Sequence, residues 1–108
     1  MRTIPSRAGF IAARSNGEKA LSRGLVIQAI ENNASHWRIG LTASKKIGNS
    51  VTRNKAKRRL REISRSVLTR LGKSGWDYVL IGRPKATTKR PFSLLEEDLE
   101  IAVKNIHS

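Results

Sequence analysis

The 108-residue sequence contains no cysteine, and only 8 of its residues are acidic against 22 lysines and arginines. The absence of cysteine excludes disulfides, cysteine-ligated zinc and thiol catalysis, and fits a reducing compartment. No apolar run approaches the roughly 20 residues that a membrane-spanning helix needs, and the first residues, MRTIPSRAGF, lack the apolar segment of a secretory signal. We therefore expect a cytoplasmic protein that does not bind membranes.

The scarcity of acids leaves a formal net charge of +14. Self-repulsion on this scale destabilises a compact state unless counter-charge is supplied, so the sequence predicts a polyanionic partner. Hydrophobic residues nevertheless make up 38% of the chain and are grouped in periodic runs. A chain of this length supports one modest core. We expect one folded basic domain over residues 1–108, with residues 1–5 as a flexible N-terminus.

Apolar spacing predicts a helix, two strands, a long helix, a strand and a last helix, over residues 6–15, 24–30, 37–44, 50–71, 77–82 and 93–106. The first two of these strands, joined by the turn residues ENNAS, are expected to pair antiparallel. The two prolines of GRPKATTKRP are taken to exclude regular structure there. The fold class is therefore α+β, of order α-β-β-(β)-α-β-α, with helices packed on a mixed sheet of about four strands.

Three details concern residues outside the basic segment. Ser93 and Glu96 have capping-box spacing, which would place the acids 96–98 in the first turn of the last helix, with Glu100 on the same solvent-facing side. The two histidines, His36 and His107, are expected to face solvent. No nucleophile, base and orienting group occur together in the pattern of a catalytic site, so we expect no catalytic residue in this chain.

The segment SKKIGNSVTRNKAKRRLREISR, residues 44–65, holds nine lysines and arginines but a single acid. Apolar residues recur every three or four positions from Ala56 to Leu71, which predicts one helix, capped by Asn49 or Ser50 and ended by Gly72. A rotation of about 100° per residue separates two flanks beside its buried stripe. The first flank carries Asn54, Lys57, Arg58, Arg61 and Arg65, and the second carries Lys55, Arg59, Glu62 and Arg70. Arg53 is in line with the stripe, one turn before it.

The alternative for such a segment is a solvated helix face, but three features favour a nucleic-acid surface. Cations repel one another at i,i+4 along the first flank, which a helix selected for stability alone would avoid. Arginine, which binds phosphate bidentately, outnumbers lysine there. Lys45 and Lys46 lie beside the helix N-terminus, whose free amides and positive dipole end favour anions.

Within this segment, SKKIGNSVTRNKAKRRLRE resembles the signature of the bacterial ribonuclease P protein family, the small protein subunit of the RNA enzyme that trims precursor tRNA 5′ ends. SKKIGN leads into Arg53, Asn54, Lys57, Arg58 and Arg61 at the family's spacing, and the similarity continues more loosely through DYVLIGRP. The resemblance implies a left-handed crossover through the long helix. It also implies a one-to-one ribonucleoprotein with the catalytic RNA, precursor tRNA as substrate, and hydrolysis performed by the RNA with Mg²⁺, with no metal assigned to protein side chains alone.

The resemblance implies two RNA surfaces. The surface for the catalytic RNA would comprise Lys45, Lys46, Asn49, Arg53, Asn54, Lys57, Arg58, Arg61 and Arg65. The cleft for the single-stranded 5′ leader would comprise Phe10, Arg14, Gln28, Thr42, Lys57 and Arg61.

The chain departs from the family pattern at a few positions. Lys55 stands where the family usually has arginine, and Gly9 where it commonly has an acid. Arg14 and Gln28 occupy positions that are commonly aromatic, and stacking on an aromatic side chain contributes about 1 to 3 kcal/mol per base. We therefore expect this cleft to hold leader bases less by stacking and more by charge and hydrogen bonds.

Two other functions stay open from the residues alone. A ribosomal or general binding protein for structured RNA would carry the same charge without assisting a reaction. A DNA-binding helix is less favoured, because no second helix precedes the basic one at helix-turn-helix spacing.

Overall fold

The computed structural model describes all 108 residues. Its elements are α1 (Arg7–Asn16), β1 (Glu18–Leu21), β2 (Leu25–Glu31), β3 (Arg38–Thr42), the short 3-10 helix η1 (Lys45–Ile47), α2 (Ser50–Leu71), β4 (Trp76–Gly82), α3 (Ala86–Lys89) and α4 (Phe92–Ile106). The three predicted helices and three predicted strands are confirmed. β1 is the additional strand before the long helix, although it precedes the other two strands, and α3 was not predicted.

The four strands form one mixed sheet in the order β1-β2-β4-β3. The predicted antiparallel pairing of β2 with β3 is wrong, because β4 lies between them: it pairs antiparallel with β2 and parallel with β3. The sequence of β4 accounts for this position. Residues 77–80 of β4 are all buried, so the strand is covered on both faces and belongs in the interior of the sheet.

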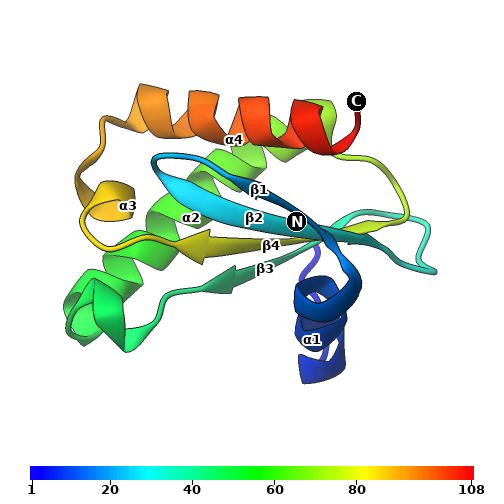
Figure 1. The fold of residues 1–108 in the computed structure, drawn as a ribbon, viewed down its shortest axis with the longest axis horizontal. Coiled ribbons are helices and arrows are strands. Elements are labelled where there is room, and N and C mark those ends of the chain that lie inside the picture. Colours follow the sequence, from blue (N-terminus) through cyan, green and yellow to red (C-terminus); the bar gives the residue numbers. More distant parts are fainter.

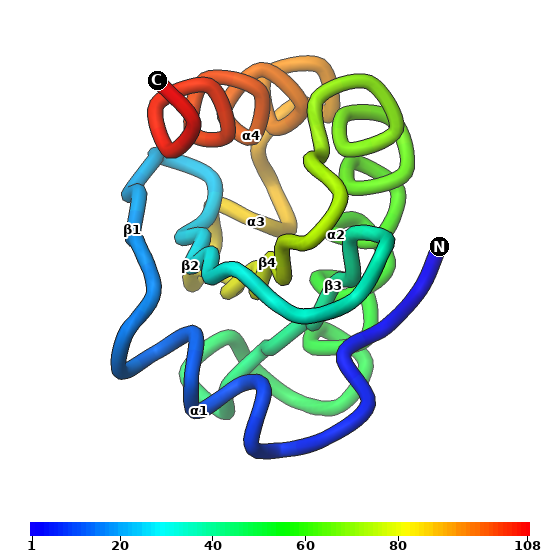
Figure 2. Tube along the Cα trace, turned by 90° about the vertical axis from the view of Figure 1, so that its right-hand side faces the viewer, coloured from blue at the N-terminus to red at the C-terminus, as the bar shows by residue number.

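The helices form a layer on each face of the sheet. α2 and α4 pack against each other and cover one face, whereas α1 lies on the other face against β2 and β4. Figure 2 looks along the strands and shows α1 below the sheet, α4 above it, and α2 rising beside the β3 edge to reach the level of α4. The chain leaves β3, passes through α2 above the sheet and returns in β4 parallel to β3 (Figures 1 and 2), so this crossover is left-handed, as the resemblance implied.

The main core lies between the sheet and the layer of α2 and α4. Leu25, Ile27 and Ala29 alternate along β2 and face this layer, where they meet a stripe from α2. The stripe is the predicted one, extended by Leu68, and its members Leu60 and Ile63 are completely buried. This burial fixes the rotation of α2, and therefore the direction in which each of its cations points.

Both ends of α2 are where the sequence predicts them. Asn49 rather than Ser50 is the N-cap, and its side-chain oxygen accepts a hydrogen bond from the amide of Thr52 at 3.0 Å. Gly72 ends the helix, and its amide donates to the carbonyl of Leu68. Asn49 thus has a structural role in addition to any contact with RNA.

The N-terminal residues lie along the outer edge of β3. The amide of Ile4 donates to the carbonyl of Ile39 at 2.8 Å, and the amide of Ile39 donates to the carbonyl of Arg2 at 2.9 Å. Ile4 is buried in a small second cluster with Ala13 and Val79. Flexibility of residues 1–5 stays a prediction, but the segment has backbone partners beside the edge strand.

The segment between β4 and α4 differs from the prediction. Residues 86–89 form the one-turn helix α3, because Pro84 and Pro91 lie outside it and restrict only the connections. α4 begins at Phe92, with the carbonyl of Pro91 accepting from the amides of Leu94 and Leu95. Ser93 is therefore inside the helix, the predicted capping box is wrong, and the acids 96–98 lie beyond the first turn.

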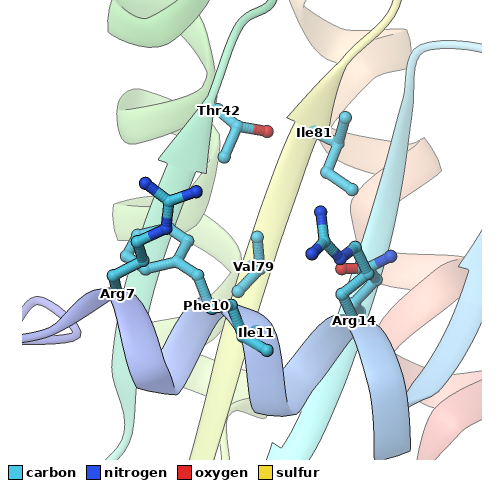
Figure 3. A pocket seen from close by; sticks show the side chains of 8 residues that line it. Arg7, Phe10, Ile11, Arg14, Thr42, Val79 and Ile81 are labelled. Carbon is cyan, nitrogen blue, oxygen red and sulfur yellow. The ribbon is translucent and has the colours of Figure 1, made fainter.

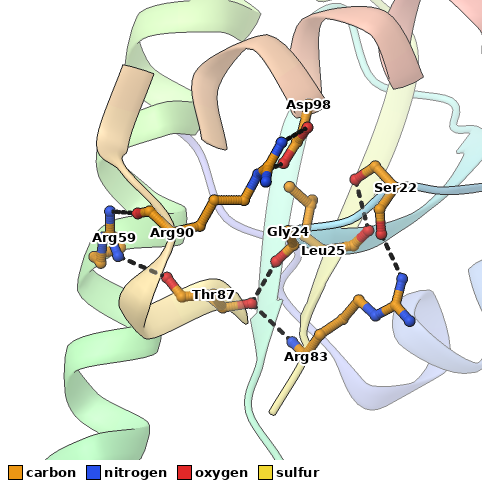
Figure 4. Close-up of polar contacts among 8 residues, drawn as sticks. All are labelled: Ser22, Gly24, Leu25, Arg59, Arg83, Thr87, Arg90 and Asp98. Atoms are coloured by element: carbon orange, nitrogen blue, oxygen red, sulfur yellow. Dashed lines mark hydrogen bonds and ion pairs between the residues drawn. The ribbon is translucent and has the colours of Figure 1, made fainter. Parts of the chain in front are cut away.

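Asp98 also differs from the prediction of a solvent-facing acid. It is 9% exposed and forms a bidentate ion pair with Arg90, at 2.6 and 3.2 Å (Figure 4). Glu97 is exposed, and Glu96 and Glu100 are half-buried. Ion pairs lower the pKa of Glu100, chiefly with Lys104 and also with Arg70.

His107 is part-buried, so the prediction that it faces solvent is wrong. Its Nε2 lies 2.6 Å from the hydroxyl of Tyr78, and its ring meets Trp76 edge-on at a centroid distance of 4.7 Å. The Tyr78 oxygen accepts a hydrogen bond from the amide of Lys73 at 3.0 Å, which leaves the hydroxyl proton free to be donated to His107. This arrangement suits a neutral imidazole whose Nε2 is the acceptor.

The buried position of His107 predicts a loss of stability in mild acid. Burial lowers its pKa, Lys73 lowers it further, and Glu18 acts weakly in the opposite direction. The folded state therefore binds fewer protons than the unfolded state. The stabilisation is fully present above the unfolded-state histidine pKa of about 6.5 and is lost as the pH falls from there through the lower folded-state pKa. Urea unfolding at pH 8 and pH 5.5 should show a smaller decline for His107→Gln than for the wild type; equal declines would contradict this assignment.

Candidate nucleic-acid interface

The first flank of α2 projects over the edge of the sheet next to β3. Lys57, Arg61 and Arg65 line a hollow of 340 Å³ together with Gly40 and Leu41 of β3 and with residues of the N-terminal segment. All three cations are exposed. Lys57 and Arg61 form no ion pair, whereas Arg65 pairs with Glu62 at 3.1 Å. The flank therefore presents two free cations and one that is partly neutralised.

A second hollow lies on the α1 face of the sheet (Figure 3). It has a volume of 320 Å³ and is lined by Arg7, Phe10, Ile11, Arg14, Gln28, Thr42, Val79 and Ile81. Figure 3 shows Arg7 and Arg14 at opposite ends of α1, with Phe10 and Ile11 between them. The floor comes from β4, whose Val79 and Ile81 are apolar, so the hollow has an apolar base with positive charge at either end.

Phe10 connects the two hollows, since its side chain lines both. The structure thereby brings together every residue predicted for the leader cleft. Phe10, Arg14, Gln28 and Thr42 line the first hollow, and Lys57 and Arg61 line the second. Phe10 is only half-buried, so it is both a packing residue of the smaller core and an accessible ring.

Gly40 of β3 provides the space for the Phe10 ring. A Cβ atom at this position would lie 2.4 Å from Cε1 and 2.5 Å from Cζ of Phe10, and 3.2 Å from Cδ1 of Ile4. The ring therefore rests directly on the backbone of the strand. This contact sets the height of α1 above the sheet and so the depth of both hollows.

Gly40→Ala should displace the ring and lower the free energy of unfolding by about 1 to 3 kcal/mol, the usual cost of overpacking. The same substitution in a Phe10→Ala background should cost less, because the clashing atoms are gone. Chemical unfolding of the four proteins of this double-mutant cycle measures the difference. Equal costs in both backgrounds would mean that Phe10 does not need the space at Gly40.

The remaining predicted residues surround the start of α2. Lys45 and Lys46 are exposed in η1, and Asn54 and Arg58 are exposed on the first turns of α2. Arg53 is half-buried, and its Nε is the one buried side-chain nitrogen or oxygen that lacks a hydrogen-bond partner. A buried donor without a partner is uncommon in proteins, and an anion at this position would satisfy it.

Sequence reasoning did not identify Arg7 and Ile11 as lining residues of the first hollow. The signal was present, because Arg7, Phe10 and Arg14 recur at i, i+3 and i+7 and therefore share one face of α1. Arg59 was assigned to the second flank of α2, and it does lie away from the hollows. There its guanidinium donates to the carbonyls of Thr87 and Arg90 and holds the α3 segment.

No three or more histidine, aspartate or glutamate side chains converge in an arrangement that could hold a metal ion. None of the helices is both long and apolar enough to span a membrane. The two hollows are lined by cations, one aromatic ring, neutral polar side chains and apolar side chains, and no set of catalytic groups converges in either. The geometry is that of a surface that binds a polyanion, with one hollow able to accept a planar base.

Fold and surface together define a small basic α+β protein whose exposed cations and apolar hollow suit a nucleic acid. The family model for ribonuclease P matches residues 2–107, and the chain belongs to this family. Among curated relatives, the ribonuclease P protein component of Ruegeria pomeroyi is 48% identical, with 97% of this chain and 86% of the relative covered. That of Paramagnetospirillum magneticum is 43% identical, with 95% and 80% covered.

Solved structures agree with this family. The ribonuclease P protein from Thermotoga maritima superimposes with a TM-score of 0.84 at 26% identity over the whole of both chains. The Staphylococcus aureus protein, solved at 2.0 Å, gives a TM-score of 0.80 at 28% identity, covering 97% of this chain and 94% of that one. The α+β fold expected from the sequence is confirmed.

Proposed function

We propose that this chain is the protein subunit of a ribonuclease P. It binds the catalytic RNA through the α2 surface, by which we mean Lys45, Lys46, Asn49, Arg53, Asn54, Arg58 and Arg65. It binds the 5′ leader of precursor tRNA in the cleft. Membership of the family supports the role. The observation that carries the assignment of surfaces is the position of Phe10, whose ring lines both hollows and so joins a cationic edge to an apolar floor. A single-stranded nucleic acid needs these two features, phosphate neutralisation and a stacking surface, within one groove.

Each group of residues has a separate part in this proposal. Lys57 and Arg61 neutralise backbone phosphates at the edge of β3. Phe10 stacks on a base, while Arg14, Gln28 and Thr42 supply charge and hydrogen bonds at positions without aromatic rings. Lys45, Lys46 and Arg53 bind the catalytic RNA around the start of α2, together with Asn49, Asn54 and Arg58. Arg65 extends this surface along the helix.

Hydrolysis is assigned to the RNA, because the chain has no set of catalytic side chains. When bound at the RNA active site, Mg²⁺ would polarise the scissile phosphate and activate the attacking water. The protein's own carboxylates do not fit a metal site, since they do not converge. Its cations instead reduce the repulsion between two RNAs, which lowers the Mg²⁺ concentration needed for productive binding.

Reconstitution tests the proposal. The protein is added to a cognate ribonuclease P RNA, and cleavage of a precursor tRNA that carries a leader is measured across a Mg²⁺ series. We expect stimulation that is largest at low Mg²⁺ and a gain in affinity for the precursor over the same tRNA without a leader. Absence of stimulation at every Mg²⁺ concentration would overturn the proposal. Stimulation without any dependence on the leader would overturn the assignment of the cleft.

A further inference from the structure

A second group of cations lies around α3, outside both hollows. Arg23, Lys85 and Lys89 line a shallow depression together with Pro84, Ala86, Arg90 and Pro91. Arg83 precedes Pro84 in the chain; its guanidinium does not line the depression but donates to the carbonyl of Ser22, next to Arg23 (Figure 4). All four cations, Arg23, Arg83, Lys85 and Lys89, are exposed, and we refer to them as the α3 patch.

No acid neutralises the α3 patch. None of its four residues forms an ion pair, and the neighbouring Arg90 is already paired with Asp98. The depression itself is lined by no carboxylate. Four like charges grouped without counter-charge raise the energy of the folded chain unless an anion binds there.

The segment that carries the patch is held rigidly by residues that were predicted to be loop. Thr87 is buried, and its hydroxyl accepts from the amide of Arg83 at 2.8 Å and donates to the carbonyl of Gly24 (Figure 4). Arg59 of α2 donates to the carbonyl of Thr87 at 3.0 Å and also to that of Arg90 (Figure 4). A segment fixed by a buried threonine and by an arginine from another helix keeps its charges at set positions, which lowers the entropy lost on binding.

The backbone conformation at Lys85 also supports a binding site here. Its φ of 65° is the only positive φ outside glycine, in a conformation that side-chain-bearing residues disfavour. Such conformations persist where the surrounding contacts determine them, and they cluster at binding sites. Here the contacts of Thr87 and Arg59 hold the turn that presents Lys85 to solvent.

We propose that the α3 patch is a further phosphate-binding surface for the same RNA that the α2 surface binds, an inference that rests on the proposed function. α3 packs on α2, on the face of the sheet opposite α1 and the Phe10 hollow. In Figure 1, α3 and the η1 segment with Lys45 and Lys46 both lie at the end of the molecule toward which β3 and β4 point. An RNA bound along the start of α2 reaches the α3 patch without crossing the sheet. A single-stranded leader in the cleft would have to cross the sheet to reach the patch. The occupant is therefore the catalytic RNA and not the leader.

The test compares two double variants that each remove two lysine charges. Lys85→Gln with Lys89→Gln changes the patch, and Lys19→Gln with Lys73→Gln is the matched control away from it. None of these four lysine side chains donates a hydrogen bond in the structure, and thermal unfolding verifies that both variants fold. Binding to the catalytic RNA is measured between 50 and 200 mM salt, and binding of precursor tRNA to the assembled ribonucleoprotein is measured separately.

For the patch variant we expect weaker binding to the catalytic RNA and a salt slope smaller by about 1.4 to 1.8, the value for two lost phosphate contacts. The ratio of its dissociation constant to that of the wild type should decrease roughly tenfold between 50 and 200 mM salt, because phosphate contacts contribute less to affinity at high salt. Behaviour equal to the control would overturn the proposal, as would a loss confined to precursor binding. Cleavage by the wild-type protein, measured in parallel, reports on the proposed function independently: stimulation that the patch variant retains with unchanged affinity refutes only the patch.

Discussion

Replacement of both Lys57 and Arg61 by glutamine should weaken binding to the catalytic RNA or to a leader-bearing precursor by roughly 100- to 10,000-fold. A hydrogen bond to a charged group contributes about 1.5 to 3 kcal/mol, two such contacts are lost, and about 1.4 kcal/mol is a factor of ten. Both side chains are exposed, neither has an acid partner, and both line the hollow beside β3. The salt slope should fall by about 1.4 to 1.8.

The neighbouring Arg65 sharpens this prediction. It already pairs with Glu62, so Arg65→Gln should cost less affinity than Arg61→Gln, and Glu62→Gln should increase affinity by releasing Arg65. Titration of labelled RNA at several salt concentrations measures all of these variants, with Lys19→Gln and Lys73→Gln as the control of equal charge. An unchanged slope in the Lys57 and Arg61 variant would show that these side chains face only water when RNA is bound.

Local signals explain why α2 could be predicted to its end residues. The spacing of its apolar residues fits a helix and not the alternation of a strand. Asn49 supplies an acceptor for the first turn, and Gly72 follows the last apolar residue. Because the buried stripe fixes rotation, the sorting of Lys57 and Arg61 from Arg59 also followed from the sequence. The predicted residues of the surface for the catalytic RNA depended on this helix and on η1 before it, whereas Phe10, Arg14, Gln28 and Thr42 come from α1, β2 and β3.

Features that depend on non-local contacts could not be predicted. The turn residues after β2 indicated a hairpin, but the hydrophobic burial of β4 on both faces places it between β2 and β3. Arg59 belongs to the same run of cations as Lys57 and Arg61, and only the approach of α3 gives it carbonyl partners. The position of His107 likewise depends on Tyr78, 29 residues away in the chain.

Asp77 is the residue for which we expect the largest effect on stability. It is 2% exposed at the start of β4 and accepts two hydrogen bonds from Arg38 of β3, at 2.7 and 2.8 Å. It also accepts one from the side chain of Asn32, in the connection between β2 and β3, at 2.6 Å. The hydrogen bonds to Asp77 raise the pKa of Arg38 above its ordinary value, so the guanidinium keeps its charge. Asp77 therefore joins β4 to the edge strand and to the connection that crosses it.

Asp77→Ala should lower the free energy of unfolding by about 3 kcal/mol, the lower end of the range for a broken buried ion pair. Only the acid is fully buried, and the Arg38 side chain left without its counter-charge is 22% exposed. The free energy of unfolding of a whole protein is only about 5 to 15 kcal/mol, so this variant should be marginally stable. Arg38→Ala should also destabilise, and the double variant should cost less than the sum, because neither charge is then left alone. Urea unfolding of the four proteins measures this coupling, and additive costs would contradict it. Gly40 and Thr42 depend on the same pairing of β3 with β4. In the single variants, RNA affinity through the Phe10 hollow should therefore fall before global unfolding in urea is complete. Binding that depends only on the start of α2 should persist to higher urea concentrations.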